Sequence, residues 1–235
     1  MTTSTVRFSR LSALLAVPAV ALSAVVGVGA LAAGPAHADQ SCTGVVKDRV
    51  IRGDVRVPRG AACDMTTVRV DGNITLAPGA TLRFRTGSVG GDVQGTSDPR
   101  VISLYRSTVD GNVQVKRAEE VRLNSQRVRG DVQVEGSTRG LDVRGSTVNG
   151  DVQVKYTSTF LQNSRVDGNV QHQEGRQLVM WRNSVGADTQ AFKNRGWLDI
   201  VSNTIRGNLQ CKENQAPSGW GNVVAGSKED QCRRF

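Results

Sequence analysis

A repeat of about 19 residues is the feature that most constrains what this chain can fold into. The motif Val-x-Gly-Asp/Asn-Val recurs, and its glycine position can be followed along the chain with steps of 18 to 20 residues. The ten reference positions are Gly53, Gly72, Gly91, Gly111, Gly130, Gly150, Gly168, Ala187, Gly207 and Gly226. One repeat has too little apolar surface to fold alone. The period therefore predicts a solenoid in which neighbouring repeats share a core.

Each repeat contains two short segments of alternating apolar residues. One follows the reference position, as in Val113 and Val115, and the other precedes it, as in Leu141 and Val143. Alternation with a period of two is typical of β-strands, and a 19-residue turn has no room for a full helix. We therefore predict an all-β fold, a single-stranded parallel β-helix (β-solenoid) of about ten rungs of 18–20 residues. Right-handed coiling is expected, because β-crossovers are overwhelmingly right-handed. A leucine-rich repeat is the alternative, but its Leu-x-x-Leu-x-Leu pattern is missing.

The Gly-Asp/Asn-Val rhythm resembles the repeats of right-handed parallel β-helix proteins, and the resemblance covers residues 39–235. It is also distantly similar to bactofilin repeats, although a signal peptide and disulfides depart from that cytoplasmic family. The segments 207–214 and 228–232 resemble the C-terminus of uncharacterised secreted bacterial β-helix proteins. These resemblances imply a fold and a location, and no activity.

The first 38 residues have the form of a secretory signal peptide. Arg7 and Arg10 precede an apolar run over residues 11–33, and Ala36-His37-Ala38 has the small-x-small form of a cleavage site. We expect a signal peptide over residues 1–38 and a secreted β-helix domain over 39–235, extracellular or associated with the cell wall. A membrane anchor is the alternative, because the apolar run approaches the length of a membrane span. After cleavage we expect no stable membrane insertion.

Four cysteines lie near the two ends of the expected solenoid. Cys42 and Cys63 are separated by 21 residues, and so are Cys211 and Cys232. This separation is one repeat plus two residues, so each pair would join neighbouring rungs near a turn. We therefore predict the disulfides Cys42–Cys63 and Cys211–Cys232, which would clip the terminal rungs. A zinc site needs more closely spaced ligands, so we expect no metal and no cofactor.

Aligned rungs also bring polar residues into columns along the solenoid. The column after the reference position is Asp or Asn from Asp54 to Asn208, and a column of glutamines lies two residues further on. We interpret the Gly-Asp/Asn pair as a bend and the glutamines as a ladder of stacked amides. Serines and asparagines four residues before the reference position are interpreted as turn residues. The functional alternative for the polar strip is binding of sugar or calcium.

An arginine strip between the two strand segments is the candidate binding site. Its members are Arg83, Arg85, Arg106, Arg122, Arg144 and Arg182. Guanidinium groups suit phosphate, sulfate and carboxylate groups, and residues 39–235 carry a net charge of about +7. The expected partner is an anionic cell-wall polymer or an acidic polysaccharide, with nucleic acid as a weaker alternative. An ordinary solvated surface is the structural alternative.

Trp181, Trp197 and Trp220 cluster late in the chain. We expect them to plug the end of the solenoid, and stacking on sugar rings is the alternative.

An enzyme must also be weighed, because several β-helix proteins are polysaccharide lyases or glycoside hydrolases. Those reactions need paired carboxylates, or calcium with a base, at the bottom of a cleft. The rungs here are so uniform in length that no insertion could form the walls of a cleft. His172 lies where other rungs have Val or Ala, which favours a partly buried side chain over a catalytic base. The sequence thus favours a non-catalytic structural or binding protein of the cell surface or extracellular matrix.

Overall fold

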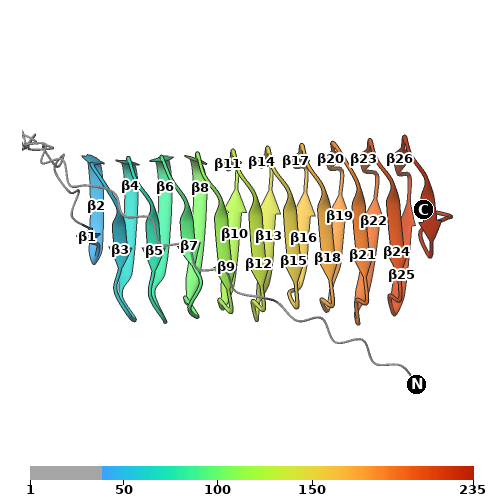
Figure 1. Ribbon diagram of the computed structural model, residues 1–235, viewed down its shortest axis with the longest axis horizontal. Coiled ribbons are helices and arrows are strands. Elements are labelled where there is room, and N and C mark those ends of the chain that lie inside the picture. The colour runs from blue at the N-terminus through green and yellow to red at the C-terminus, as the bar shows by residue number, and fades with distance from the viewer. Residues whose placement is uncertain (1–38) are drawn as a thin grey trace, which may run out of the picture. The chain divides into compact units, whose positions relative to one another are not determined.

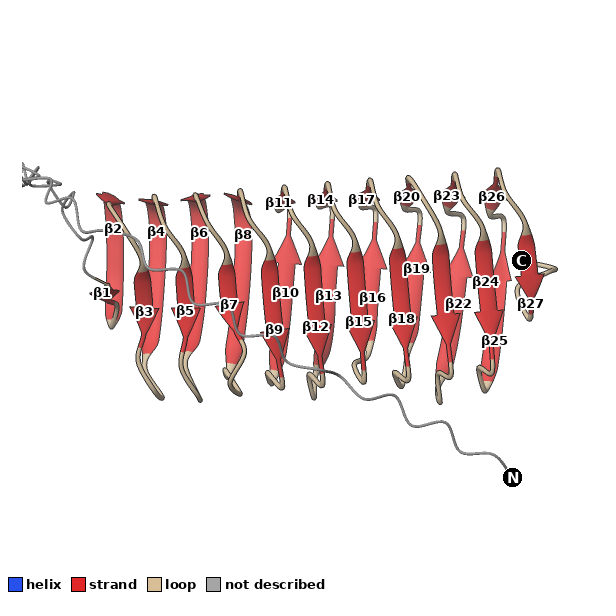
Figure 2. Ribbon diagram, in the orientation of Figure 1, coloured by secondary structure: helices blue, strands red, loops and turns tan. Residues whose placement is uncertain are grey.

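The computed structural model describes residues 39–235, and the expected signal peptide over residues 1–38 lies outside this range. The described part is built from 27 β-strands, all paired in parallel, and contains no helix (Figure 2). Consequently, nothing in residues 39–235 forms a helix long and apolar enough to cross a membrane. The strands wind into a solenoid of about ten turns, as the repeat predicts (Figure 1).

Each rung of the solenoid contributes strands to three faces. Near strands in Figure 1 run downward and far strands run upward while the chain advances from left to right, so the coil is right-handed. The first face is a sheet of 11 strands. Its strands are β1 (Gln40–Ser41), β3 (Val55–Val57), β5 (Ile74–Leu76), β7 (Val93–Gly95), β9 (Val113–Lys116), β12 (Val132–Glu135), β15 (Val152–Lys155), β18 (Val170–Gln173), β21 (Thr189–Phe192), β24 (Leu209–Lys212) and β27 (Lys228–Asp230).

The second and third faces belong to one sheet of 16 strands. In the early rungs a single strand bends across both faces: β2 (Gly44–Ile51), β4 (Ala62–Val70), β6 (Thr81–Val89) and β8 (Val101–Val109). Later the second face has its own strands: β10 (Glu120–Asn124), β13 (Gly140–Arg144), β16 (Thr159–Gln162), β19 (Leu178–Trp181), β22 (Trp197–Val201) and β25 (Ala216–Trp220). The third face then consists of β11 (Arg127–Val128), β14 (Thr147–Val148), β17 (Arg165–Val166), β20 (Ser184–Val185), β23 (Thr204–Ile205) and β26 (Val223–Val224).

Apolar side chains fill the interior in columns that continue from rung to rung. Leu82 pairs in register with Ile102, and the same column continues through Val121 and Leu141. All four side chains are fully buried. Burial of one such side chain contributes about 1.5–3 kcal/mol. Stacking of apolar side chains from successive rungs therefore gives the solenoid a continuous core that no single repeat has, as the alternating pattern predicts.

The Gly-Asp/Asn pair forms the corner that leads into the first face, and its side chains connect the rungs. The Oδ1 atom of each Asp or Asn accepts a hydrogen bond from the backbone N–H of the equivalent residue in the next rung, at 2.7–3.1 Å. Glycine is needed for space, since a Cβ at Gly150 would lie 2.1 Å from the Oδ1 of Asp131. Where Ala187 replaces glycine, the hydrogen bond from Asp188 is the longest of the series, at 3.1 Å. The interpretation of this column as a structural bend is confirmed.

A second polar ladder lies inside the solenoid, at the corner between the second and third faces. Its buried members include residues that the sequence pattern marks as turn residues: Ser107, Ser146, Ser164, Asn183, Asn203 and Asn222. The backbone N–H of Asn183 donates to the Oδ1 of Asn203 at 2.9 Å, and Asn203 donates to Asn222 in the same way. The Nδ2 of Asn203 donates to the carbonyl of Met180 at 3.1 Å. The side chains therefore point inward and satisfy backbone groups that the sharp corner releases from the sheet.

A disulfide joins neighbouring rungs at each end of the solenoid. Cys42 is bonded to Cys63 and Cys211 to Cys232, with Cα–Cα distances of 5.6 Å and 5.2 Å. All four side chains are buried. Gly44 is the residue in register with Cys63, so the predicted two-residue offset is present. The pairing follows the spacing of the cysteines, and two disulfides are compatible with an extracellular location.

Candidate polymer-binding face

The six arginines of the predicted strip all lie exposed on the second face or on the corner that follows it. Alternation along the strands explains this for Arg83 and Arg122, because each is flanked by two buried apolar residues. Arg83 and Arg122 share one column with Ser103 between them, and Arg85 lies in a second column that also contains Arg144. Arg106 and Arg182 complete the strip on the corner. The structure therefore brings the predicted residues together on one surface.

Backbone strain sets the position of the two corner arginines. Arg106 and Arg182 have φ values of 48° and 54°, in the left-handed region that favours glycine. Gly145 occupies the same column with a φ of 56°. The turn therefore lifts the two arginine side chains onto the outer edge of the second face.

Half of the strip is neutralised by neighbouring carboxylates. The three ion pairs are Arg83–Asp64 at 3.2 Å, Arg122–Glu120 at 2.6 Å and Arg144–Asp142 at 2.7 Å. The arginine side chains of these pairs are 46–56% exposed, so each pair contributes at most about 1 kcal/mol to stability. Their main effect is on charge, because a paired guanidinium attracts a polyanion less strongly than a free one.

The other three arginines have no carboxylate within ion-pair distance anywhere in the described chain. The Arg106 guanidinium lies over the Tyr105 ring, 5.1 Å from its centroid, and Arg182 lies over Trp181 at 4.8 Å. Arg85 has neither kind of partner among residues 39–235. The sequence pattern treats the six arginines as equivalent, whereas the structure concentrates the free positive charge at Arg85, Arg106 and Arg182.

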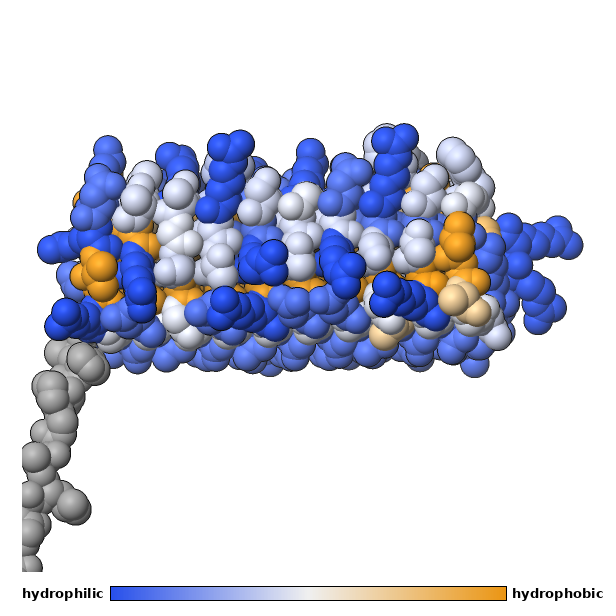
Figure 3. Space-filling model, turned by 90° about the horizontal axis from the view of Figure 1, so that it is seen from above, coloured by the Kyte–Doolittle hydropathy of each residue, from blue (hydrophilic) through white to orange (hydrophobic). Residues whose placement is uncertain are grey.

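Arginines also lie on the third face, and three of them are ion-paired. Their ion pairs are Arg69–Asp71, Arg129–Asp110 and Arg165–Asp167. Figure 3 views this face and shows a largely hydrophilic surface, with the largest hydrophobic patches near its two ends. Val50 and Val223 are among the exposed apolar residues there. Arg127 and Arg206 of the third face have no carboxylate within ion-pair distance in the described chain, so this face carries free arginines as well.

The prediction that the tryptophans plug the end of the solenoid is wrong. Trp181, Trp197 and Trp220 are 42%, 70% and 68% exposed and stand on the outer side of the second face. Trp181 and Trp220 border a groove of about 400 Å³. Phe235, which packs against Gly219 of the last rung, closes the core at that end instead.

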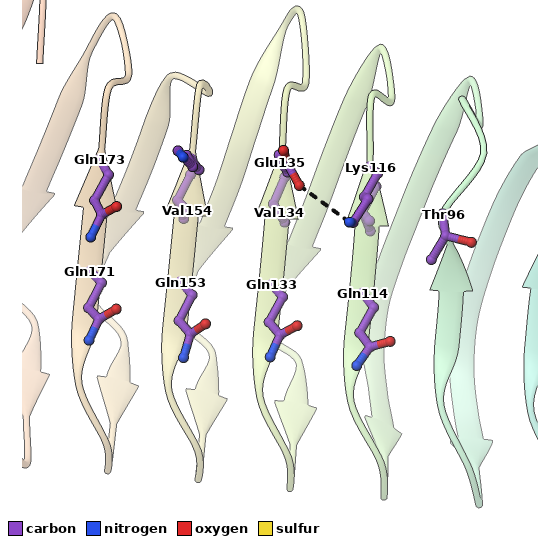
Figure 4. Close-up of a pocket in the computed structure, with 12 residues that line it drawn as sticks. Thr96, Gln114, Lys116, Gln133, Val134, Glu135, Gln153, Val154, Gln171 and Gln173 are labelled. Carbon is purple, nitrogen blue, oxygen red and sulfur yellow. Dashed lines mark ion pairs between the residues drawn. The ribbon is translucent and has the colours of Figure 1, made fainter. Parts of the chain in front are cut away.

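The first face contains a shallow polar groove of about 290 Å³ (Figure 4). One side is the glutamine column from Gln114 to Gln171, and the other is the row that contains Lys116, Glu135 and Lys155. The predicted amide ladder is only partly formed. Gln190 donates to Gln210 at 3.1 Å, but no glutamine–glutamine hydrogen bond joins the four residues along this groove within the described structure. The groove's one carboxylate, on Glu135, is paired with Lys116 at 3.5 Å.

His172 is fully buried, more completely than the sequence pattern suggests. Its Nδ1 lies 2.8 Å from the Oδ1 of Asn194 and its Nε2 lies 2.9 Å from the carbonyl oxygen of Thr157. Loss of hydration lowers the pKa of His172 to about 4, although both hydrogen bonds act in the opposite direction. A neutral imidazole inside the wall has no access to a substrate. Among residues 39–235, no three His, Cys, Asp or Glu side chains lie close enough to share a metal ion.

Comparison with protein-family models, with curated proteins and with solved structures finds no match to this chain. The similarity to bactofilins and to secreted bacterial β-helix proteins therefore rests on the repeat rhythm and the C-terminal segments of the sequence alone. What is established is the architecture, a parallel β-solenoid with two disulfides.

Proposed function

We propose that the protein is a secreted, non-catalytic binding protein of the cell surface or extracellular matrix. Its second face would hold an extended anionic polymer, either a cell-wall polymer or an acidic polysaccharide. The observation that carries this proposal is the grouping of six exposed arginines on one face, with free positive charge at Arg85 and Arg106. Export is supported by the leader-like residues 1–38 and by the two disulfides.

The shape of the rungs favours a linear ligand over a substrate held in a cleft. The longest connection between strands in the described chain covers residues 96–100, so the faces carry no large loops. An extended chain lying along the solenoid would meet arginines from successive rungs at intervals of about 4.8 Å. Several weak contacts of this kind add up, because each bound unit raises the effective concentration of the next.

Retention of the protein on purified cell walls, teichoic acid and polygalacturonate across a salt series tests the proposal. We expect retention at low salt and release as salt rises, because exposed charges are screened within about 10 Å at 0.1 M. The variant Arg85→Ser/Arg106→Ser should bind on the order of tenfold more weakly, since exposed charge contacts contribute up to about 1 kcal/mol each. Both side chains are exposed, so the variant should fold normally.

The matched control is Arg127→Ser/Arg206→Ser, which removes the same charge from the third face. Binding by the control variant should stay close to that of the parent. Equal losses in both variants would mean that net charge, and not the arginine strip, attracts the polymer. Release of shortened or unsaturated glycan products would favour the alternative function, a polysaccharide lyase or glycoside hydrolase.

A further inference from the structure

All three tryptophans of the chain are exposed on the second face, over β19, β22 and β25. Large exposed aromatic side chains are uncommon on soluble proteins and gather where a surface makes contact with a ligand or partner. Outward positions of this face in earlier rungs include the charged and hydroxyl residues Asp64, Arg83, Ser103 and Arg122. The late rungs therefore differ in chemistry from the arginine-rich early rungs.

Two of the tryptophans border one groove, here called the tryptophan groove. Trp181, Val201 and Trp220 are in register on three successive strands, so two rung spacings of about 4.8 Å separate the strands that carry the indoles. The groove between them has a volume of about 400 Å³. This is within the range of small-molecule sites, which combine apolar walls with a few polar groups. Trp197 stands outside the groove lining.

The polar groups of the tryptophan groove are balanced in charge. Asp199 lies beside Val201 on β22, and the Ser218 hydroxyl donates a hydrogen bond to its carboxylate. Arg182 lies over the Trp181 ring and supplies the opposite charge. Because the Asp199 carboxylate would repel phosphate, the groove is poorly suited to a nucleic acid backbone. A hydroxyl-bearing, uncharged ligand fits this balance better than either a polyanion or a polycation.

We propose that the tryptophan groove binds the pyranose rings of a neutral oligosaccharide. The C–H face of a pyranose is apolar and stacks on an indole, whereas its rim of hydroxyls hydrogen-bonds to carboxylate, hydroxyl and guanidinium groups. Trp181 and Trp220 provide the stacking surfaces, and Asp199, Ser218 and Arg182 provide the hydrogen-bonding partners. This site goes beyond the polymer-binding function proposed above and does not depend on it.

Calorimetric titration with cellotetraose and chitotetraose as probes tests the inference. At least one probe should bind the parent protein with an affinity that hardly changes between low and high salt. Trp181→Ala and Trp220→Ala should each weaken binding about tenfold, a loss of about 1.4 kcal/mol, because each removes one of the two stacking surfaces. Trp197→Ala is the matched control, and its binding should stay within about twofold of the parent.

Failure to bind either tetrasaccharide at millimolar concentration would overturn the inference, as would equal effects of all three tryptophan variants. Two further measurements would show whether the groove binds a different ligand. Trp181-dependent binding of a thymidine octanucleotide without sugar binding would assign the groove to single-stranded nucleic acid. A monomer–dimer equilibrium that Trp181→Ala abolishes would assign it to self-association. Salt dependence separates this site from the arginine strip, so either proposal can fail without the other.

Discussion

At the scale of single residues, His172 shows how the solenoid accommodates a polar side chain in its wall. Neighbouring rungs place Thr157 and Asn194 in a buried ladder, but the rung between them has Gly175 at the equivalent position. The imidazole of His172 fills the space that Gly175 leaves and bridges the two neighbouring rungs. Both ring nitrogens face oxygen acceptors, and a neutral imidazole can donate to only one of them.

This geometry predicts a loss of stability in mild acid. Burial lowers the pKa of His172 to about 4, below an unfolded value of about 6.5, so between these values the unfolded chain binds the additional proton. The His172 contribution is therefore fully present above pH 6.5 and is lost as pH falls toward 4. Protonation of His172 in the unfolded chain should make the free energy of unfolding, measured in urea, about 2–3 kcal/mol lower at pH 4.5 than at pH 7.5. His172→Val, which cannot titrate, should lack this part of the pH dependence; the same dependence in both proteins would contradict the assignment.

At the scale of the rung, side-chain ladders at the corners complement the backbone pairing of the faces. The asparagine ladder between the second and third faces contains Asn183, Asn203 and Asn222. Asn183 and Asn203 hydrogen-bond to the rungs on either side, and Asn222 bonds to the rung before it. Serine and glutamine fill equivalent places in earlier rungs, as with Ser107 and Gln126. A rung is thus stabilised by its neighbours through corners as well as through strands.

Asn203→Ala tests the ladder. The substitution leaves the N–H of Asn183 and the carbonyl of Met180 buried without these partners, and each such group costs about 1–3 kcal/mol. The free energy of unfolding measured in urea should fall by about 2–4 kcal/mol. Thr204→Ala, at the next and exposed position, should change it by less than about 0.5 kcal/mol. Similar small effects of both substitutions would show that water replaces the asparagine ladder.

At the scale of the whole molecule, the repeat allows the solenoid fold to be predicted from the sequence. Once Leu82, Ile102 and Val121 fall into one column, the positions of every face follow by alternation. The same alternation places Trp181 outward, because it follows the buried Met180, and this signal contradicts the prediction of a plug. The cysteine pairing follows for the same reason, since it needs only the rung length.

The parts that were not predictable depend on side-chain geometry between rungs. Asp64 neutralises Arg83 from one rung away, and nothing in the spacing distinguishes that arginine from the unpaired Arg85. Ser and Asn are common in turns, so the sequence pattern marks Asn203 and Asn222 as turn residues without indicating that their side chains point inward. The sequence thus locates the arginine strip, and the structure shows which of its arginines lack an ion pair.

Arginine labelling with phenylglyoxal, followed by peptide mass mapping, tests the central claim most directly. With a bound anionic polymer, Arg85 and Arg106 should be protected from modification, whereas Arg127 and Arg206 of the third face should react as in the free protein. Protection confined to the second face would agree with a polymer lying along the arginine strip. Equal protection of all four arginines, or protection of the third face alone, would contradict it.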